Sequence, residues 1–282
     1  MKRNPSRTRS LATFLATVAL ILVSSARARA EIPTAAQAPF GKGLLAAQQQ
    51  EWEIALQSFQ EARKAAPDAP EIYYNLGLTE SKLPGRELRA IAWFGAYLAM
   101  NPNALNLPAV KNVIASLQIK NEGNIRRLIK TLQSSVELVN KPLSKSSYED
   151  DIAVAQLSVG EFAGAQKTID DALLVFSTIP NADSVFKMNL RGDEFKINRA
   201  VSGQPLQSTA PVPIISSWIE IVDHELNLPM FLDPADYFKS WAASDDPDRI
   251  SFGLSLALRR TVDERDKIAS MLKQQAQQAP PR

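Results

Sequence analysis

The sequence predicts an all-α protein, a solenoid of helical hairpins followed by a small helical subdomain near the C-terminal end. Two observations support this prediction. Apolar residues recur at spacings of three and four along most of the chain, which is the period of a helix with one buried face. One set of spaced residues also occurs twice, 35 residues apart, which indicates a repeated unit. No segment shows the sustained alternation of apolar and polar residues that is typical of a strand.

The first 30 residues predict a secretory signal peptide. A basic start, MKRNPSRTRS, precedes an apolar run from Leu11 to Val23, and Ala28-Arg29-Ala30 then provides a cleavage site of the small-x-small type. The apolar run is short for a membrane-spanning helix, which needs about 20 residues. We therefore expect cleavage after Ala30 and a bacterial protein that is periplasmic or secreted, with no stable membrane anchor. An uncleaved anchor is the alternative.

Cleavage would also change the net charge. The whole chain has 32 basic and 30 acidic residues, but six of the basic residues and none of the acidic ones lie in residues 1–30. The mature chain would have 26 basic and 30 acidic residues, a net charge of −4. Nucleic-acid binding, which favours a basic surface, is therefore not expected. The chain has no cysteine, so its core must be held together without disulfides.

Residues 36–104 are expected to form two hairpins built on one plan. The second helix of each contains an alanine, an aromatic residue, a second core residue and a proline, at steps of four, three and five. These residues are Ala55, Phe59, Ala62 and Pro67 in the first copy, and Ala90, Phe94, Tyr97 and Pro102 in the second. The first helix of each copy contributes a glycine, Gly43 or Gly77.

This pattern resembles the tetratricopeptide repeat (TPR), which has a period of 34 residues. Tyr73, Leu76 and Gly77 supply the aromatic residue, leucine and glycine of its first helix. Each copy departs from the family pattern at two positions: Pro39 and Lys42 in the first, and Glu80 and Tyr97 in the second.

Small residues let two helices approach closely, so we expect Gly43 to pack against Ala55 and Gly77 against Ala90. Phe59 and its equivalent in the second copy would then fill the space between neighbouring hairpins. The prolines would end the second helices.

Residues 105–180 are expected to continue the stack with a further helical hairpin and a degenerate third copy. Two amphipathic runs, 106–119 and 121–138, would form that hairpin. In the third copy Ala153 replaces the glycine, and Ala165, Ile169 and Ala172 keep the spacing of the second helix. Pro180 comes three residues late, so this second helix should be longer.

Residues 181–212 predict a loop or linker, in which 184–201 is the one stretch compatible with a short helix. Residues 213–277 predict a C-terminal subdomain of three helices. The first would begin near Ile214, and the other two would start at Asp233-Pro234 and Asp246-Pro247, where an aspartate cap precedes a proline.

The sequence offers little material for catalysis. His224 is the only histidine and cysteine is absent, so a zinc site of nitrogen and sulfur ligands and a cysteine nucleophile are both excluded. No glycine loop for phosphate and no serine elbow occurs. We therefore expect no catalytic residue, metal or cofactor.

The alternative is a periplasmic enzyme that uses the repeats as a docking module and carboxylates of the C-terminal helices as catalysts. The candidate acids are Glu220, Asp223, Glu225 and Asp233.

The resemblance to TPR proteins implies a function in protein binding. In that family the first helices of successive hairpins line a concave groove that holds a peptide or a partner helix. The corresponding positions here are Leu44, Ala47 and Gln48, then Tyr74, Leu78, Ser81 and Lys82. Because leucines occupy the middle of this set, a hydrophobic or amphipathic partner segment fits better than a C-terminal carboxylate.

We therefore expect a non-catalytic TPR scaffold or adaptor of the bacterial cell envelope. Two alternatives remain open for its surface and its assembly. The chain's own terminal helices could cover the groove, and the protein could be a structural subunit of a larger envelope machine.

Overall fold

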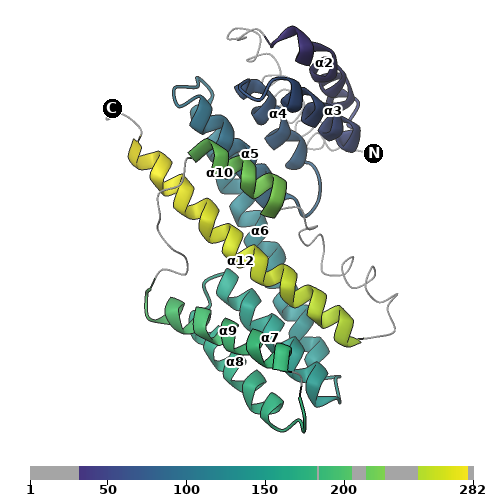
Figure 1. Cartoon of the computed structure of the whole chain (residues 1–282), viewed down its shortest axis with the longest axis vertical. Helices are drawn as coiled ribbons and strands as arrows, with labels where there is room; N and C mark the ends of the chain where they lie inside the picture. Colours follow the sequence, from purple (N-terminus) through teal and green to yellow (C-terminus); the bar gives the residue numbers. More distant parts are fainter. Residues whose placement is uncertain (1–31, 183, 205–213, 226–246, 279–282) are drawn as a thin grey trace, which may run out of the picture.

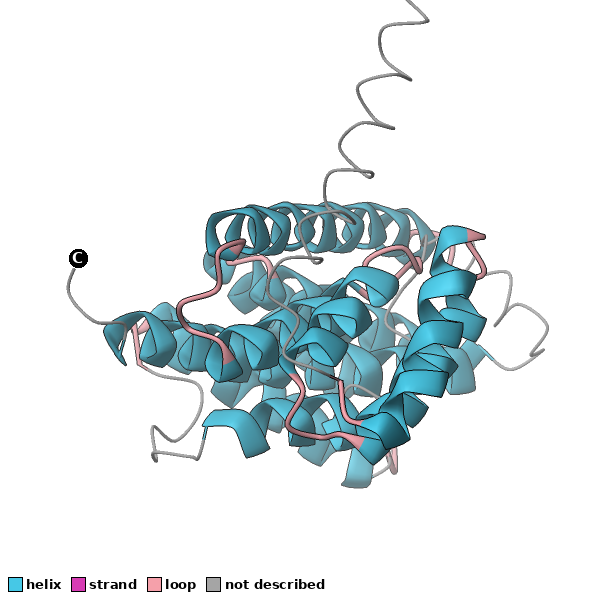
Figure 2. Ribbon diagram, turned by 90° about the horizontal axis from the view of Figure 1, so that it is seen from above, coloured by secondary structure: helices cyan, strands magenta, loops and turns pink. Residues whose placement is uncertain are grey.

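The computed structural model describes residues 32–182, 184–204, 214–225 and 247–278. Every regular element in these ranges is helical, as Figures 1 and 2 show, and the predicted all-α class is confirmed. The α-helices are α2 Thr34–Gln48, α3 Trp52–Ala65, α4 Pro70–Glu80, α5 Glu87–Met100, α6 Leu107–Val136, α7 Pro142–Ser158, α8 Phe162–Ser177, α9 Ser184–Val201, α10 Ile214–Glu220 and α12 Pro247–Gln278. A short π-helix, η1 Ile221–Glu225, directly follows α10.

Helices that are neighbours in sequence pack in pairs and form the predicted stack of hairpins. The pairs are α2 with α3, α4 with α5, and α7 with α8, and α3 packs on α4 to join the first two. Within the described helices, none is both long enough and apolar enough to cross a membrane.

The glycines of the first two hairpins pack against phenylalanine rings, a contact that the sequence analysis did not predict. A β-carbon at Gly43 would lie 2.6 Å from the ring of Phe59, and one at Gly77 would lie 2.8 Å from the ring of Phe94. Helical side chains point toward the N-terminus of their helix, so each ring reaches back over the preceding turn to the glycine. Each ring therefore fills space inside its own hairpin, and filling of the space between hairpins stays a prediction.

The third hairpin keeps this arrangement with different residues. Ala153 stands in place of the glycine and Ile169 in place of the phenylalanine, and both are fully buried. A larger residue on the first helix is thus combined with a smaller one on the second, so the core stays filled. The turn uses Gly160 at φ +78°, a conformation that glycine adopts without strain. Helix α8 has 16 residues against 14 in α3 and in α5, as the late proline predicted.

Helix α6 overturns the prediction of a hairpin within residues 105–138. It is one continuous helix of 30 residues, from Leu107 to Val136. Its buried stripe stays in helical phase across the expected turn, because Asn121 and Asn124 occupy buried positions between the two apolar runs. Gly123 weakens the helix most at that point, and a single glycine costs a helix only about 1 kcal/mol.

Two long helices join two hydrophobic cores. The first core contains residues of α2–α5, the N-terminal half of α6, α10, η1 and the C-terminal part of α12. The second contains residues of the C-terminal half of α6, α7–α9 and Val262 of α12. Figure 1 shows α12 running diagonally between the two groups of hairpins.

The C-terminal helices α10, η1 and α12 follow the hairpins, as predicted, and pack closely on them. In the part of the chain that the structure describes, their buried residues join the two cores of the hairpin stack. Trp218 of α10 is fully buried against α5, where a β-carbon at Gly95 would lie 2.8 Å from its indole.

The predicted linker contains a helix of 18 residues, α9, at the stretch that the sequence marked as compatible with a helix. The expected start at Asp233-Pro234 lies outside the described residues.

Two glycine-to-alanine substitutions should have opposite effects on stability. Gly77→Ala places a methyl group against the buried ring of Phe94 and should lower the free energy of unfolding by roughly 1–3 kcal/mol. Gly123→Ala meets no atom within 4 Å and should raise it by about 0.5–1 kcal/mol, because alanine favours a continuous helix. Urea unfolding followed by circular dichroism measures both. A loss of stability in Gly123→Ala would argue against the single helix α6.

Candidate functional site

The predicted groove residues occupy equivalent positions of the two repeats, on α2 and α4 except for Ser81 and Lys82, which directly follow α4. Leu44 and Leu78 each follow the packing glycine of their helix, and both are half-buried against the first core. Ala47 and Ser81 lie one turn further along and are also half-buried. The next residues, Gln48 and Lys82, are exposed. In both repeats a half-buried leucine is thus followed, four residues later, by an exposed polar residue.

Tyr74 is mainly a packing residue. It lies three positions before its glycine, as Phe40 does in the first hairpin, and Phe40 contacts Phe59 with ring centroids 5.6 Å apart. In the same way the ring of Tyr74 contacts Phe94 at 6.0 Å and Tyr97 at 5.2 Å. Since Tyr74 remains half-buried, only part of the side chain is accessible to a partner.

Comparison with known families adds one finding. Residues 17–70 and 40–104 match the model of the tetratricopeptide repeat. Residues 17–104 are therefore similar to tetratricopeptide repeats, a module that generally binds other proteins. The hairpin of α7 and α8 lies outside the match. Neither the search of curated proteins nor that of solved structures gave a match.

The second repeat contains three tyrosines whose ionisation is suppressed. Burial raises the pKa of Tyr73, Tyr74 and Tyr97 above the usual value. The hydroxyl group of Tyr97 donates a hydrogen bond to Oδ1 of Asn106 at 2.6 Å, and the hydroxyl group of Tyr73 donates to the carbonyl oxygen of Pro67 at 2.7 Å. All three phenols are therefore neutral at physiological pH and serve as packing groups.

Glu80 departs from the repeat pattern in a way that the structure explains. Its carboxylate is fully buried, where the family has an aromatic residue. It accepts hydrogen bonds from Arg89 at 3.0 Å and from Arg86 at 3.3 Å. A buried carboxylate requires such partners. Glu80 therefore connects α4 to α5 through Arg89 and to the loop before α5 through Arg86.

The acids proposed for an enzyme are not gathered at one site, as far as the described residues allow a comparison. Glu220 is exposed, and Asp223 accepts three hydrogen bonds of 3.0 Å from the guanidinium group of Arg63. The side chains of Glu225 and His224, and all of Asp233, lie outside the described part. Among the residues described, no cluster of three or more acids or histidines could hold a metal ion.

The ion pair of Arg63 and Asp223 has a structural function. Arg63 lies on α3 and Asp223 on η1, so the pair connects the first hairpin to the C-terminal helices. The guanidinium group also lies 5.2 Å from the ring centre of Trp93, which adds a cation–π contact. Asp223 thus fixes η1 to the repeats.

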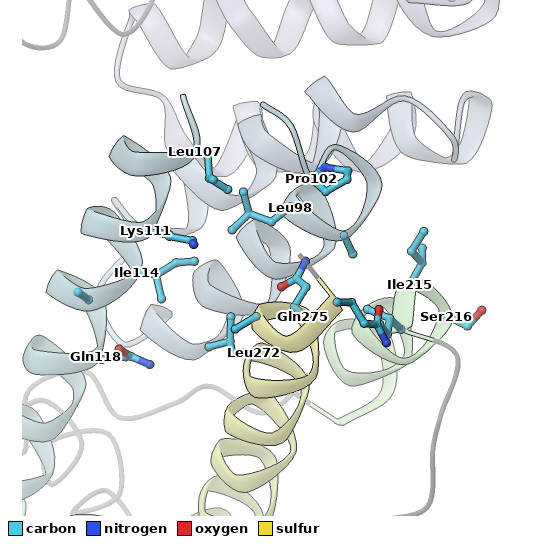
Figure 3. Close-up of a pocket in the computed structure, with 15 residues that line it drawn as sticks. Leu98, Pro102, Leu107, Lys111, Ile114, Gln118, Ile215, Ser216, Leu272 and Gln275 are labelled. Carbon is cyan, nitrogen blue, oxygen red and sulfur yellow. The ribbon is translucent and has the colours of Figure 1, made fainter. Parts of the chain in front are cut away.

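A cleft that the sequence did not predict lies between α5, α6, α10 and α12. Its volume is about 630 Å³, and Figure 3 shows Leu98, Ile114 and Leu272 around it. Lys111, Ala115 and Gln118 line it from the exposed face of α6, at the helical spacing of four and three. The opposite walls come from residues about 100 positions or more further along the chain, so only the folded structure identifies the cleft.

The buried tyrosines should make the protein sensitive to alkali. A raised pKa in the folded state means that the phenol stabilises the fold fully below pH 10, and that this contribution is lost as the pH rises through the folded-state pKa. Urea unfolding at pH 8 and at pH 11 should therefore show a smaller free energy of unfolding at the higher pH. Tyr97→Phe should reduce that loss, because it removes one ionising group. An equal loss in the variant and the wild type would contradict this assignment.

Proposed function

We propose that the protein is an exported, non-catalytic adaptor that binds a segment of a partner protein along α2 and α4. The observation that carries the proposal is that the same kinds of residue recur at equivalent positions of the two repeats. We call these residues, Leu44, Gln48, Leu78 and Lys82, the binding row. Leu44 and Leu78 supply half-buried apolar positions, and Gln48 and Lys82 supply exposed polar ones. The match to the tetratricopeptide repeat over these helices supports the same function.

The row also limits the kind of partner. Its apolar positions favour a segment with apolar residues on one face, as in recognition of an amphipathic helix. Lys82 and Gln48 at the edge favour polar or acidic residues beside that face. A partner that carries only a C-terminal carboxylate would leave the leucines without contacts. The preferred partner is therefore an amphipathic segment.

The envelope location rests on the sequence of residues 1–30. The basic start, the apolar run and Ala28-Arg29-Ala30 together support export and cleavage. A mature chain without cysteine is also indifferent to the redox state outside the cytoplasm. We place the adaptor in the periplasm or outside the cell.

Photo-crosslinking tests the binding row. A crosslinking amino acid at position 48 or at position 82 should capture the same partner from envelope fractions of the source cells, because both positions border the row. The same amino acid at Leu174, an exposed position on α8, is the matched control and should not capture it.

Substitution of a leucine in the binding row provides a second test of partner binding. Leu78→Asp should lower partner recovery at least fivefold, because it places a charge among the apolar contacts. Circular dichroism checks that the variant is folded, and Lys82→Glu tests the row without touching the core. Equal recovery from the wild type and from both variants would refute binding along α2 and α4.

Export predicts a defined N-terminus. Protein isolated from the source cells should begin at Glu31, as N-terminal sequencing or intact mass would show. Ala28→Arg should block processing and leave the precursor in the membrane fraction. A wild-type protein that keeps residues 1–30 and sediments with membranes would instead support the uncleaved anchor.

A further inference from the structure

The cleft between α5, α6, α10 and α12 is separate from the binding row on α2 and α4. Its lining contains no residue of the row. A volume of about 630 Å³ lies within the range of sites for small molecules, about 300–1,000 Å³. Figure 3 shows the cleft bounded by α6 on one side, α10 on the other and the end of α12 below.

The lining of the cleft is aliphatic. Ten of the 15 lining residues are leucine, isoleucine, alanine or proline, and none of the 15 is aromatic or acidic. Leu98 and Ile114 are buried at its wall, and Leu272 is half-buried opposite them. Such a surface gains free energy by covering a flexible alkyl chain, and it has no ring on which a planar aromatic ligand could stack.

One charged group faces this aliphatic surface. Lys111 is the only charged residue of the lining, and Figure 3 shows its ammonium group pointing into the cleft. It is exposed, and it takes part in none of the ion pairs found among the described residues. The remaining polar residues of the lining are a serine and three glutamines, which are neutral. The cleft thus combines an apolar wall with a single positive charge.

The wall on the α12 side is held in place. Nε2 of Gln275 donates a hydrogen bond of 3.1 Å to the carbonyl oxygen of Gly95 on α5. Trp218 packs α10 onto the same glycine. The helices that bound the cleft are therefore joined to α5 by side-chain contacts, so a ligand would meet a site that is already formed.

We propose that this cleft binds a single-chain aliphatic carboxylate, a medium-chain fatty acid. The alkyl chain lies along Leu98, Ile114 and Leu272, and the carboxylate pairs with the ammonium group of Lys111. The charge of Lys111 selects an anionic head group, and the aliphatic lining selects the chain. This binding is independent of the protein partner proposed above, because the two sites share no residue.

Calorimetric titration of the purified protein with dodecanoate, below its micelle concentration, tests the proposal. We expect one saturable site with a dissociation constant below about 100 µM, which corresponds to about −5.5 kcal/mol. Dodecyltrimethylammonium has the same chain and the opposite charge, and it should bind at least about tenfold more weakly. Absence of saturable binding of dodecanoate, or equal binding of the two amphiphiles, would overturn the proposal.

Variants of the lining locate the binding. Lys111→Ala should weaken dodecanoate binding about three- to fivefold, the effect of one exposed ion pair. Lys130→Ala removes an exposed lysine of the same helix outside the cleft and should change nothing. Ala115→Phe and Gln118→Trp alter exposed lining positions and should each weaken binding at least tenfold by filling the cleft. Unchanged affinity in both filling variants would refute the site.

The two proposals can fail separately. Leu78→Asp should lose the protein partner and keep its affinity for dodecanoate, and Ala115→Phe should do the reverse. Should an amphipathic peptide with one acidic residue saturate the cleft while dodecanoate does not, the cleft is a second protein-binding site and the fatty-acid proposal is wrong. Circular dichroism of each variant shows that the helices are intact.

Discussion

The indole of Trp218 lies so close to Gly95 that even a β-carbon at residue 95 would overlap it. This contact seats α10 on α5, and the backbone of the same glycine accepts the hydrogen bond from Gln275 of α12. Helix α5 also packs on α4 and α6, and it is buried from Glu87 to Leu98. The second repeat is thus the centre around which the C-terminal helices, the first core and the cleft are organised.

The hairpins could be predicted because their determinants are local. The spacing of Ala55, Phe59 and Ala62, and its recurrence, depends on the period of one helix and not on distant contacts. The continuity of α6 was missed because Asn121 and Gly123 resemble a turn, whereas the buried stripe stays in phase across them. The starts of α10 at Ile214 and of α12 at Pro247 agree with the prediction. Where these helices pack could not be predicted, since the close contact of Trp218 with Gly95 exists only after α5 has folded.

For the candidate sites too, local sequence patterns predicted the positions within each helix but not the contacts between distant helices. The register of Leu44 and Leu78 follows from the repeat, and the structure places both at equivalent half-buried positions, although whether they bind a partner stays a prediction. For Tyr74 the sequence could not separate a groove residue from a packing residue, because the answer depends on its contacts with Phe94 and Tyr97. The cleft combines residues between 98 and 118 with residues 214–216 and residues between 272 and 278, so no local pattern could predict it.

Helices α6 and α12 each contribute buried residues to both cores, and this has a mechanical consequence. A stack of independent hairpins can bend at any junction and can lose its end units one at a time. Here α6, of 30 residues, and α12, of 32 residues, both cross the junction between the two cores. Bending at that junction would require both helices to bend as well, so they should make it stiffer than a junction between two independent hairpins.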